Sequence, residues 1–106
     1  MDISERDWKL LRKLHDTALQ RYCERVVAEC RHVLDDTAES AHVRFLQLYD
    51  LSHIRNRELA RAFDDLRRST AIDRVVAMRH LGVLTDEDLL AFSPETRAAV
   101  QRRETP

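Results

Sequence analysis

Two pairs of glutamate and histidine have the spacing that helical metal sites use. Glu29 and His32 form one Glu-x-x-His pair, and Glu39 and His42 form the other. Residues three apart share a helix face, and di-iron carboxylate bundles use this spacing to hold an ion. Successive residues of a helix are turned by about 100° around its axis. If the chain reverses between the two pairs, they therefore lie on opposite sides of the seam, which is the line of side chains along which the two helices pack. We therefore expect no bound metal, and a metal-binding bundle is the third-ranked hypothesis.

The other side chains that could carry catalysis lack suitable partners. Cys23 and Cys30 stand seven residues apart, which is about 10 Å along a helix and too far for a disulfide. We expect inert, partly apolar thiols of a reducing compartment, because His15 and His32 lie off the face that a catalytic base would need. A single glycine in 106 residues excludes the glycine-rich loops that hold phosphates and dinucleotides. The sequence predicts no enzyme, no catalytic residue and no cofactor.

Long helices must position these side chains. The chain has only one glycine and two prolines. Sheets and tight turns need these residues, so their scarcity favours helices. Apolar residues recur every three or four positions from Trp8 to Val33, after Ser4 as N-cap. The segment 35–40 is the predicted reversal, with Asp36 or Thr37 as the cap of a second helix. Folding the chain at this point places the second helix's seam, which includes Phe45, against the first helix, with Tyr22 opposite Ser52 and His15 opposite Leu59.

Short helices follow the predicted hairpin. Ser69 and Thr70 can cap a third helix, although the second helix could equally continue through them. Gly82 has the position of a helix C-terminal glycine, and Thr85 and Ser93 can cap two further helices, the last with proline at its first position. The tail from Gln101 is expected to fray. The predicted fold is all-α and bundle-like: one domain over 1–106, with a hairpin over 1–69 and a helical cap over 70–103.

The predicted open end of the hairpin is basic. Residues 6–13 and 55–74 carry ten cations and five anions, whereas residues 24–50 at the tip carry three cations and six anions. Such an end could receive nucleic acid or another polyanion, and the candidate contacts are Arg57, Arg61, Arg67, Arg68 and Arg74. A solvated, internally paired surface is the plainer interpretation. Binding of nucleic acid is the second-ranked hypothesis.

A second apolar stripe favours a protein partner. The interface residues that we predict are Val27, Leu34, Val43, Leu46 and Tyr49. A two-helix hairpin cannot bury such a face alone, so either the C-terminal helices cover it or another chain does. The C-terminal pieces are short, and a second copy is the simplest cover. The first-ranked hypothesis is a non-enzymatic helical protein–protein interaction module, expected to be a homodimer.

Composition sets the expected location. The net charge is −1, so no global field draws the chain to nucleic acid or membrane. Its N-terminal segment has neither the basic nor the apolar region of an export signal. No apolar run approaches 18 residues. We expect a cytoplasmic protein without a membrane partner, and the sequence identifies neither its physiological partner nor its pathway.

Overall fold

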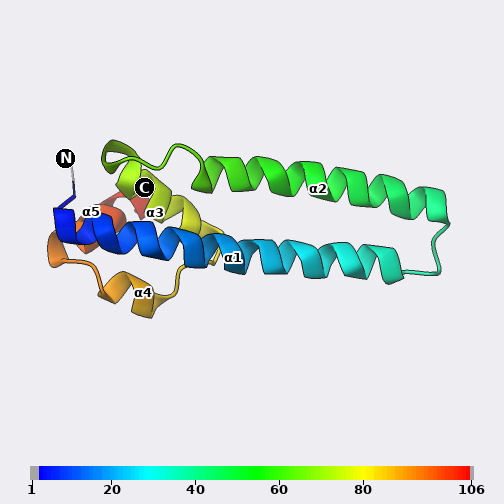
Figure 1. The fold of residues 1–106 in the computed structure, drawn as a ribbon, viewed down its shortest axis with the longest axis horizontal. Helices are drawn as coiled ribbons and strands as arrows, with labels where there is room; N and C mark the ends of the chain where they lie inside the picture. The colour runs from blue at the N-terminus through cyan, green and yellow to red at the C-terminus, as the bar shows by residue number, and fades with distance from the viewer. Residues whose placement is uncertain (1–2, 106) are drawn as a thin grey trace.

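The protein folds entirely into helices. The computed structural model describes residues 3–105 and is 81% helical, with no strand among those residues. In chain order the elements are α1 (Glu5–Asp35), α2 (Ala41–Phe63), a 3-10 turn (Arg68–Thr70), α3 (Ala71–His80), α4 (Asp86–Leu90) and α5 (Pro94–Glu104). α1 and α2 form a long hairpin, and the molecule measures 52 × 24 × 21 Å (Figure 1). The predicted all-α, bundle-like fold is confirmed.

Hydroxyl side chains begin four of the helices. As predicted, Ser4, Thr85 and Ser93 each accept a hydrogen bond from a backbone N–H three residues on, which satisfies a donor that the first turn leaves unpaired. The cap predicted for α2 is wrong, because Ser40 accepts from the Val43 N–H at 3.1 Å. Asp36 and Thr37 instead belong to the turn, where the Glu39 N–H donates to the Asp36 carbonyl.

The reversal lies within the predicted segment 35–40, but the later start of α2 changes the register of the hairpin. Tyr22 reaches the backbone of Arg55, and His15 reaches the backbone of Phe63, at 2.9 Å in each case. The two helices are therefore offset by about one helical turn from the register predicted with a reversal at Thr37. His15 also meets the Phe63 ring edge-on, with centroids 5.4 Å apart. It is a half-buried residue with a hydrogen-bond partner, as its place in the seam predicts.

α2 ends at Phe63, before the predicted hairpin limit at residue 69. Asp64 is the C-cap, and Asp65 adopts a left-handed φ of 59°, a conformation that aspartate tolerates better than most residues. Arg74 donates to the Asp64 carbonyl at 2.8 Å, and Thr70 donates to the Asp65 carbonyl at 2.7 Å. These bonds satisfy carbonyls that the last turn leaves free. The third helix is thus a separate element, α3.

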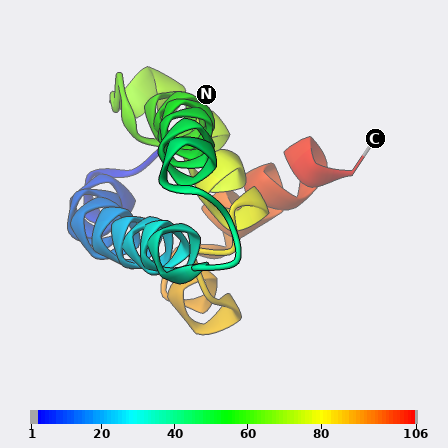
Figure 2. The ribbon, with the colours of Figure 1, turned by 90° about the vertical axis from the view of Figure 1, so that its right-hand side faces the viewer.

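The three C-terminal helices pack at the open end of the hairpin. α3 lies against both α1 and α2 and carries α5 on its other side. Seen end-on, α3 and α5 lie to one side of the hairpin, and α4 lies beyond α1 (Figure 2). The fully buried apolar side chains all belong to this end, and the largest are Leu11, Tyr22, Val75, Met78 and Val100. The core is therefore confined to about half of the molecule's length.

The predictions for the end of α3 and for the C-terminal tail have different outcomes. Gly82 has a φ of +74° after the end of α3, as its position predicts, and an L side chain rarely adopts that conformation. The tail predicted to fray from Gln101 is helical to Glu104. Arg79 on α3 donates to Glu104 at 2.8 Å, and Arg103 pairs with Asp73. These contacts tie the last turn of α5 to α3.

Candidate protein-interaction surface

The outer part of the hairpin has no core of its own. We call residues 23–61 the arm, which comprises α1 beyond Tyr22, the turn, and α2 up to Arg61. Not one side chain of the arm is buried, and the C-terminal helices pack at the other end (Figure 1). Of the two covers that the sequence allows for its apolar stripe, the C-terminal helices do not provide one. Large apolar side chains of the arm are instead in contact with solvent.

A polar cluster joins the helices where the arm begins. Tyr22 donates to the Arg55 carbonyl and to the Glu58 carboxylate, at 2.9 Å each. Arg55 in turn donates two 3.0 Å bonds to Glu29 and one 2.9 Å bond to Glu58. Burial and the hydrogen bond to Glu58 raise the pKa of Tyr22, whereas the bond from Tyr22 helps to lower the pKa of Glu58. The cluster therefore holds α1 to α2 in one register.

The arm's two broad faces differ in what covers them. Arg25 and Glu29 lie on the same side as His80 and Leu81 of α3, where they line one hollow together. Val27 stands two residues from both Arg25 and Glu29, so at about 100° per residue it points nearly opposite to them. We call the side of Val27 the outer face of the arm. No C-terminal helix lies over it.

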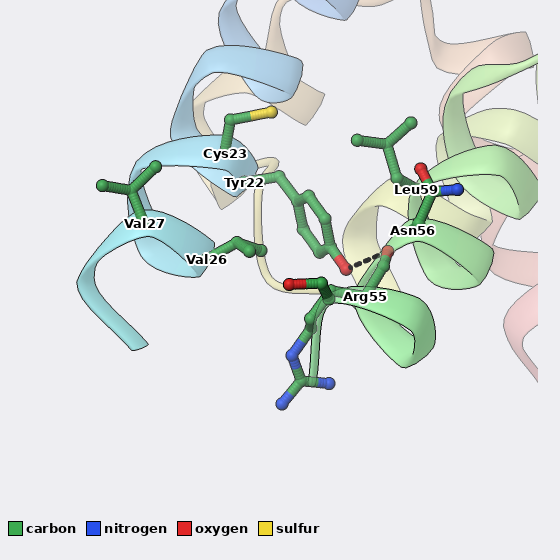
Figure 3. A pocket seen from close by; sticks show the side chains of 8 residues that line it. Tyr22, Cys23, Val26, Val27, Arg55, Asn56 and Leu59 are labelled. Atoms are coloured by element: carbon green, nitrogen blue, oxygen red, sulfur yellow. Dashed lines mark hydrogen bonds between the residues drawn. The ribbon is translucent and has the colours of Figure 1, made fainter. Parts of the chain in front are cut away.

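The outer face carries an apolar hollow between the helices. Its volume is about 220 Å³, and its lining includes Cys23 and Val27 of α1 and Ser52 and Asn56 of α2. Figure 3 shows the Tyr22 ring crossing from α1 toward α2 at its floor. The polar atoms near the floor are already paired, because Arg55 and Tyr22 belong to the cluster described above. The hollow therefore presents mainly apolar surface.

Three of the five predicted interface residues belong to the outer face. Val27, Leu34 and Tyr49 lie on it, where their residues are exposed by 48%, 47% and 63%. Val43 does not, because it stands one turn before Gln47, which lines a hollow with Glu29 and His32 on the other side. Leu46 points away from α1, about 160° around α2 from Leu48. The five residues therefore do not all lie on the outer face, and whether they form an interface stays a prediction.

Phe45 is the interface candidate that sequence analysis missed. It is 63% exposed, although the periodicity places it in the seam against α1. It precedes Tyr49 by four residues and Ser52 by seven, so the three share one side of α2. A slide of one full turn presents nearly the same side of α2 to α1, so it is the lack of buried side chains in this part of the hairpin that leaves Phe45 exposed. A helical-wheel comparison with Tyr49 is the sequence signal that could have found it.

The predicted anion contacts are largely engaged within the chain. Arg67 pairs with Asp65, Arg68 pairs with Glu5, and Arg74 donates to the Asp64 carbonyl. Among residues 3–105, Arg57 and Arg61 alone of the five make no ion pair or side-chain hydrogen bond. Arg67, Arg68 and Arg74 thus stabilise the open end of the hairpin through contacts within the chain.

The Glu-x-x-His residues are separated by the fold. Glu29 is held by Arg55, and Glu39 lies in the turn before α2 begins. Within the described part of the chain, no three histidine, cysteine, aspartate or glutamate side chains gather as metal ligands. Cys23 and Cys30 are free thiols, half-buried on α1.

The fold and the surface together define an all-α protein with a projecting two-helix arm. Comparisons with protein-family models, with curated proteins and with solved structures found no match to this chain. Among residues 3–105, no helix combines the length and the apolar character needed to cross a membrane.

Proposed function

We propose that this chain is a non-enzymatic helical interaction module that associates through its arm, with a second copy as the partner. The observation that carries the proposal is the lack of any buried side chain in residues 23–61. Helices derive most of their stability from packing an apolar face. Two hairpins that pack their arms together form a four-helix core, which supplies that packing.

The exposed apolar groups support the same proposal. Each large apolar side chain left in water forgoes about 1.5–3 kcal/mol relative to burial. Phe45 and Tyr49 are each 63% exposed, and Val27 and Leu34 are about half exposed, on one face. Several such residues together are a large cost against a total stability of about 5–15 kcal/mol. Their contiguity on a helical surface is typical of protein-binding sites.

Association is expected in a reducing, aqueous compartment such as the cytoplasm. Cys23 and Cys30 are unpaired thiols on or beside the apolar face, and thiols persist where disulfides are reduced. Nucleic acid remains the alternative partner. Three of the five arginines of its proposed site are engaged within the chain, and only Arg57 and Arg61 have no side-chain partner in residues 3–105. We therefore rank the apolar arm above the basic end.

Sedimentation of matched variants tests the proposal. Val27→Glu places a charge on the outer face and is expected to shift the wild-type dimer to monomer. Leu46→Glu introduces the same charge at a residue of equal exposure, 46% against 48%, but off that face, and is expected to leave the dimer intact. A wild-type chain that stays monomeric at high concentration contradicts self-association. Equal effects of the two substitutions contradict the assignment of the outer face.

A further inference from the structure

We infer that two copies join outer face to outer face with their arms antiparallel, about a two-fold axis at the level of Ala28 and Asp50. This inference rests on the proposed self-association and adds the orientation and the register of the partner. In this arrangement α1 lies beside α1 of the partner and α2 beside α2 of the partner. The two cores then lie at opposite ends of a shared four-helix segment.

The apolar stretches of the two helices begin and end at the same levels. On the outer face, α1 contributes side chains from Cys23 to Leu34, and α2 contributes them from Phe45 to Asn56. Near the tip, Arg44 donates to the Leu34 carbonyl. At the other limit, Tyr22 donates to the Arg55 carbonyl. A two-fold axis through the common midpoint therefore lays uncharged surface on uncharged surface along the whole stretch.

No charged side chain interrupts this stretch. The outer-face positions of α1 are Cys23, Val27, Cys30 and Leu34, and those of α2 are Phe45, Tyr49, Ser52 and Asn56. They follow one another at intervals of three or four residues, which keeps them on one side of each helix. A face that holds no charge can meet a copy of itself without like-charge contact. This makes a second copy a fitting occupant.

The antiparallel arrangement sets large side chains against small ones. Residues equidistant from the axis meet, so Phe45 faces Asn56 of the partner subunit and Tyr49 faces Ser52 of the partner subunit. Each aromatic ring thereby enters the hollow of about 220 Å³ that Ser52 and Asn56 line. A projection and a hollow on one face, related by a two-fold axis, are self-complementary.

A parallel arrangement, with both tips at one end, fits less well. It sets α1 against α2 of the partner, so Leu34 would meet Phe45 of the partner subunit while Cys23 would meet Asn56 of the partner subunit. Large side chains then face large ones, and small side chains face small ones. Helical layers interdigitate better when sizes alternate.

Charge separates the two arrangements further. The tip of the arm carries Asp35, Asp36 and Glu39, and the start of α1 carries exposed Lys9 and Lys13. A parallel dimer brings both acidic turns together and both basic ends together, which is unfavourable. The antiparallel dimer separates the like charges. It also sets Glu24 close to Arg31 of the partner subunit, because these residues lie nearly equidistant from the axis at the rim of α1.

Spin labels can measure the orientation. Lys9 is replaced by an unnatural amino acid that takes the spin label without reaction at a thiol, so Cys23 and Cys30 of the outer face stay in place. The distance between the two labels is read by pulsed dipolar spectroscopy. At 1.5 Å per residue, the antiparallel dimer places the labelled positions about 60 Å apart. A parallel dimer places them within about 30 Å, since bundled helices pack 8–10 Å apart. A short distance overturns the antiparallel inference while leaving self-association in place.

Small-angle scattering of the unmodified chain provides a second measurement that needs no substitution. The antiparallel dimer is expected to have a longest dimension of about 75 Å, against the 52 Å of a single chain. A dimer no longer than a single chain overturns the antiparallel inference. A single-chain mass, with no dipolar signal between labels, rejects the proposed self-association itself. The two failures are therefore distinct.

Discussion

Arg55 on α2 holds the carboxylate of Glu29 on α1 through two hydrogen bonds of 3.0 Å each. This bidentate pair stands just beyond Tyr22, the last buried residue of α1. Arginine is suited to the role because its planar guanidinium matches both carboxylate oxygens at once. The pair therefore fixes the register of the arm at the point where the apolar core ends.

Removing the guanidinium is expected to loosen the hairpin. Arg55→Gln leaves Glu29 without its partner and sets it near Glu58 with no positive charge between them. The expected loss in free energy of unfolding is about 1–3 kcal/mol, the usual cost of unpairing charge-assisted hydrogen bonds. Urea denaturation measures it. Arg57→Gln is the control, since Arg57 is exposed and unpaired among the described residues, and it should change stability by less than about 0.5 kcal/mol.

Asp7 predicts a specific loss of stability in acid. Its side chain is fully buried, and its carboxylate accepts from the Ser93 hydroxyl at 2.6 Å and the Thr96 hydroxyl at 2.5 Å. Burial opposes ionisation, but these bonds outweigh it and hold the pKa of Asp7 below its ordinary value. A depressed folded pKa means that the stabilisation is present above the unfolded pKa and is lost as pH falls through the folded one.

Denaturation of Asp7→Asn across the pH range measures this contribution. At neutral pH the variant is expected to be less stable than wild type by about 2–3 kcal/mol. The difference should shrink below about pH 4, where the unfolded carboxyl takes up its proton. Asp50→Asn, at an exposed position of α2, should show neither effect. A difference that persists unchanged at low pH would mean that the amide disrupts packing rather than removing a charge.

Hydrogen exchange is expected to divide the chain into two parts. The arm has no buried side chain, so its backbone amides depend on the partner for protection from exchange. The C-terminal helices pack around a core of their own. Val27→Glu should therefore speed exchange by at least about tenfold in residues 23–61. Residues 71–100 should keep their wild-type protection. Uniform acceleration along the whole chain would contradict an arm that is stabilised separately by association.

Where the helices begin and end could largely be predicted from the sequence, because most of their ends carry local signals. Ser4, Thr85, Ser93 and Gly82 act through backbone groups within a few residues, so their roles can be inferred without tertiary contacts. The end of α2 could not be predicted in this way. It depends on Arg74 and Thr70, which return to the carbonyls of Asp64 and Asp65 only after α3 has folded back.

The candidate surface was predicted only in part, because periodicity does not show where the apolar core stops. Val27, Leu34 and Tyr49 follow from periodicity. Phe45 was placed by the same periodicity in the seam against α1, but no residue of α2 before Ala62 is buried, and Phe45 is 63% exposed. Which part of the hairpin has a core depends on where α3 to α5 pack, and no local pattern reveals that.

A charge-swap experiment tests the contact at the rim of the inferred dimer. In the antiparallel arrangement Glu24 lies close to Arg31 of the partner subunit, and the symmetry repeats the contact. Glu24→Arg alone, or Arg31→Glu alone, sets like charges together twice in each dimer. Each substitution is expected to weaken association by about 1–2 kcal/mol, since exposed pairs contribute up to about 1 kcal/mol each.

Combining the two substitutions restores opposite charges and should recover most of the wild-type affinity. Within one chain Glu24 and Arg31 are two helical turns, about 10 Å, apart, so recovery cannot come from an intrachain pair. Sedimentation at low ionic strength measures the dissociation constants, and added salt should reduce every difference because the pairs are exposed. Additive losses in the double variant would place these residues away from each other and count against the antiparallel register.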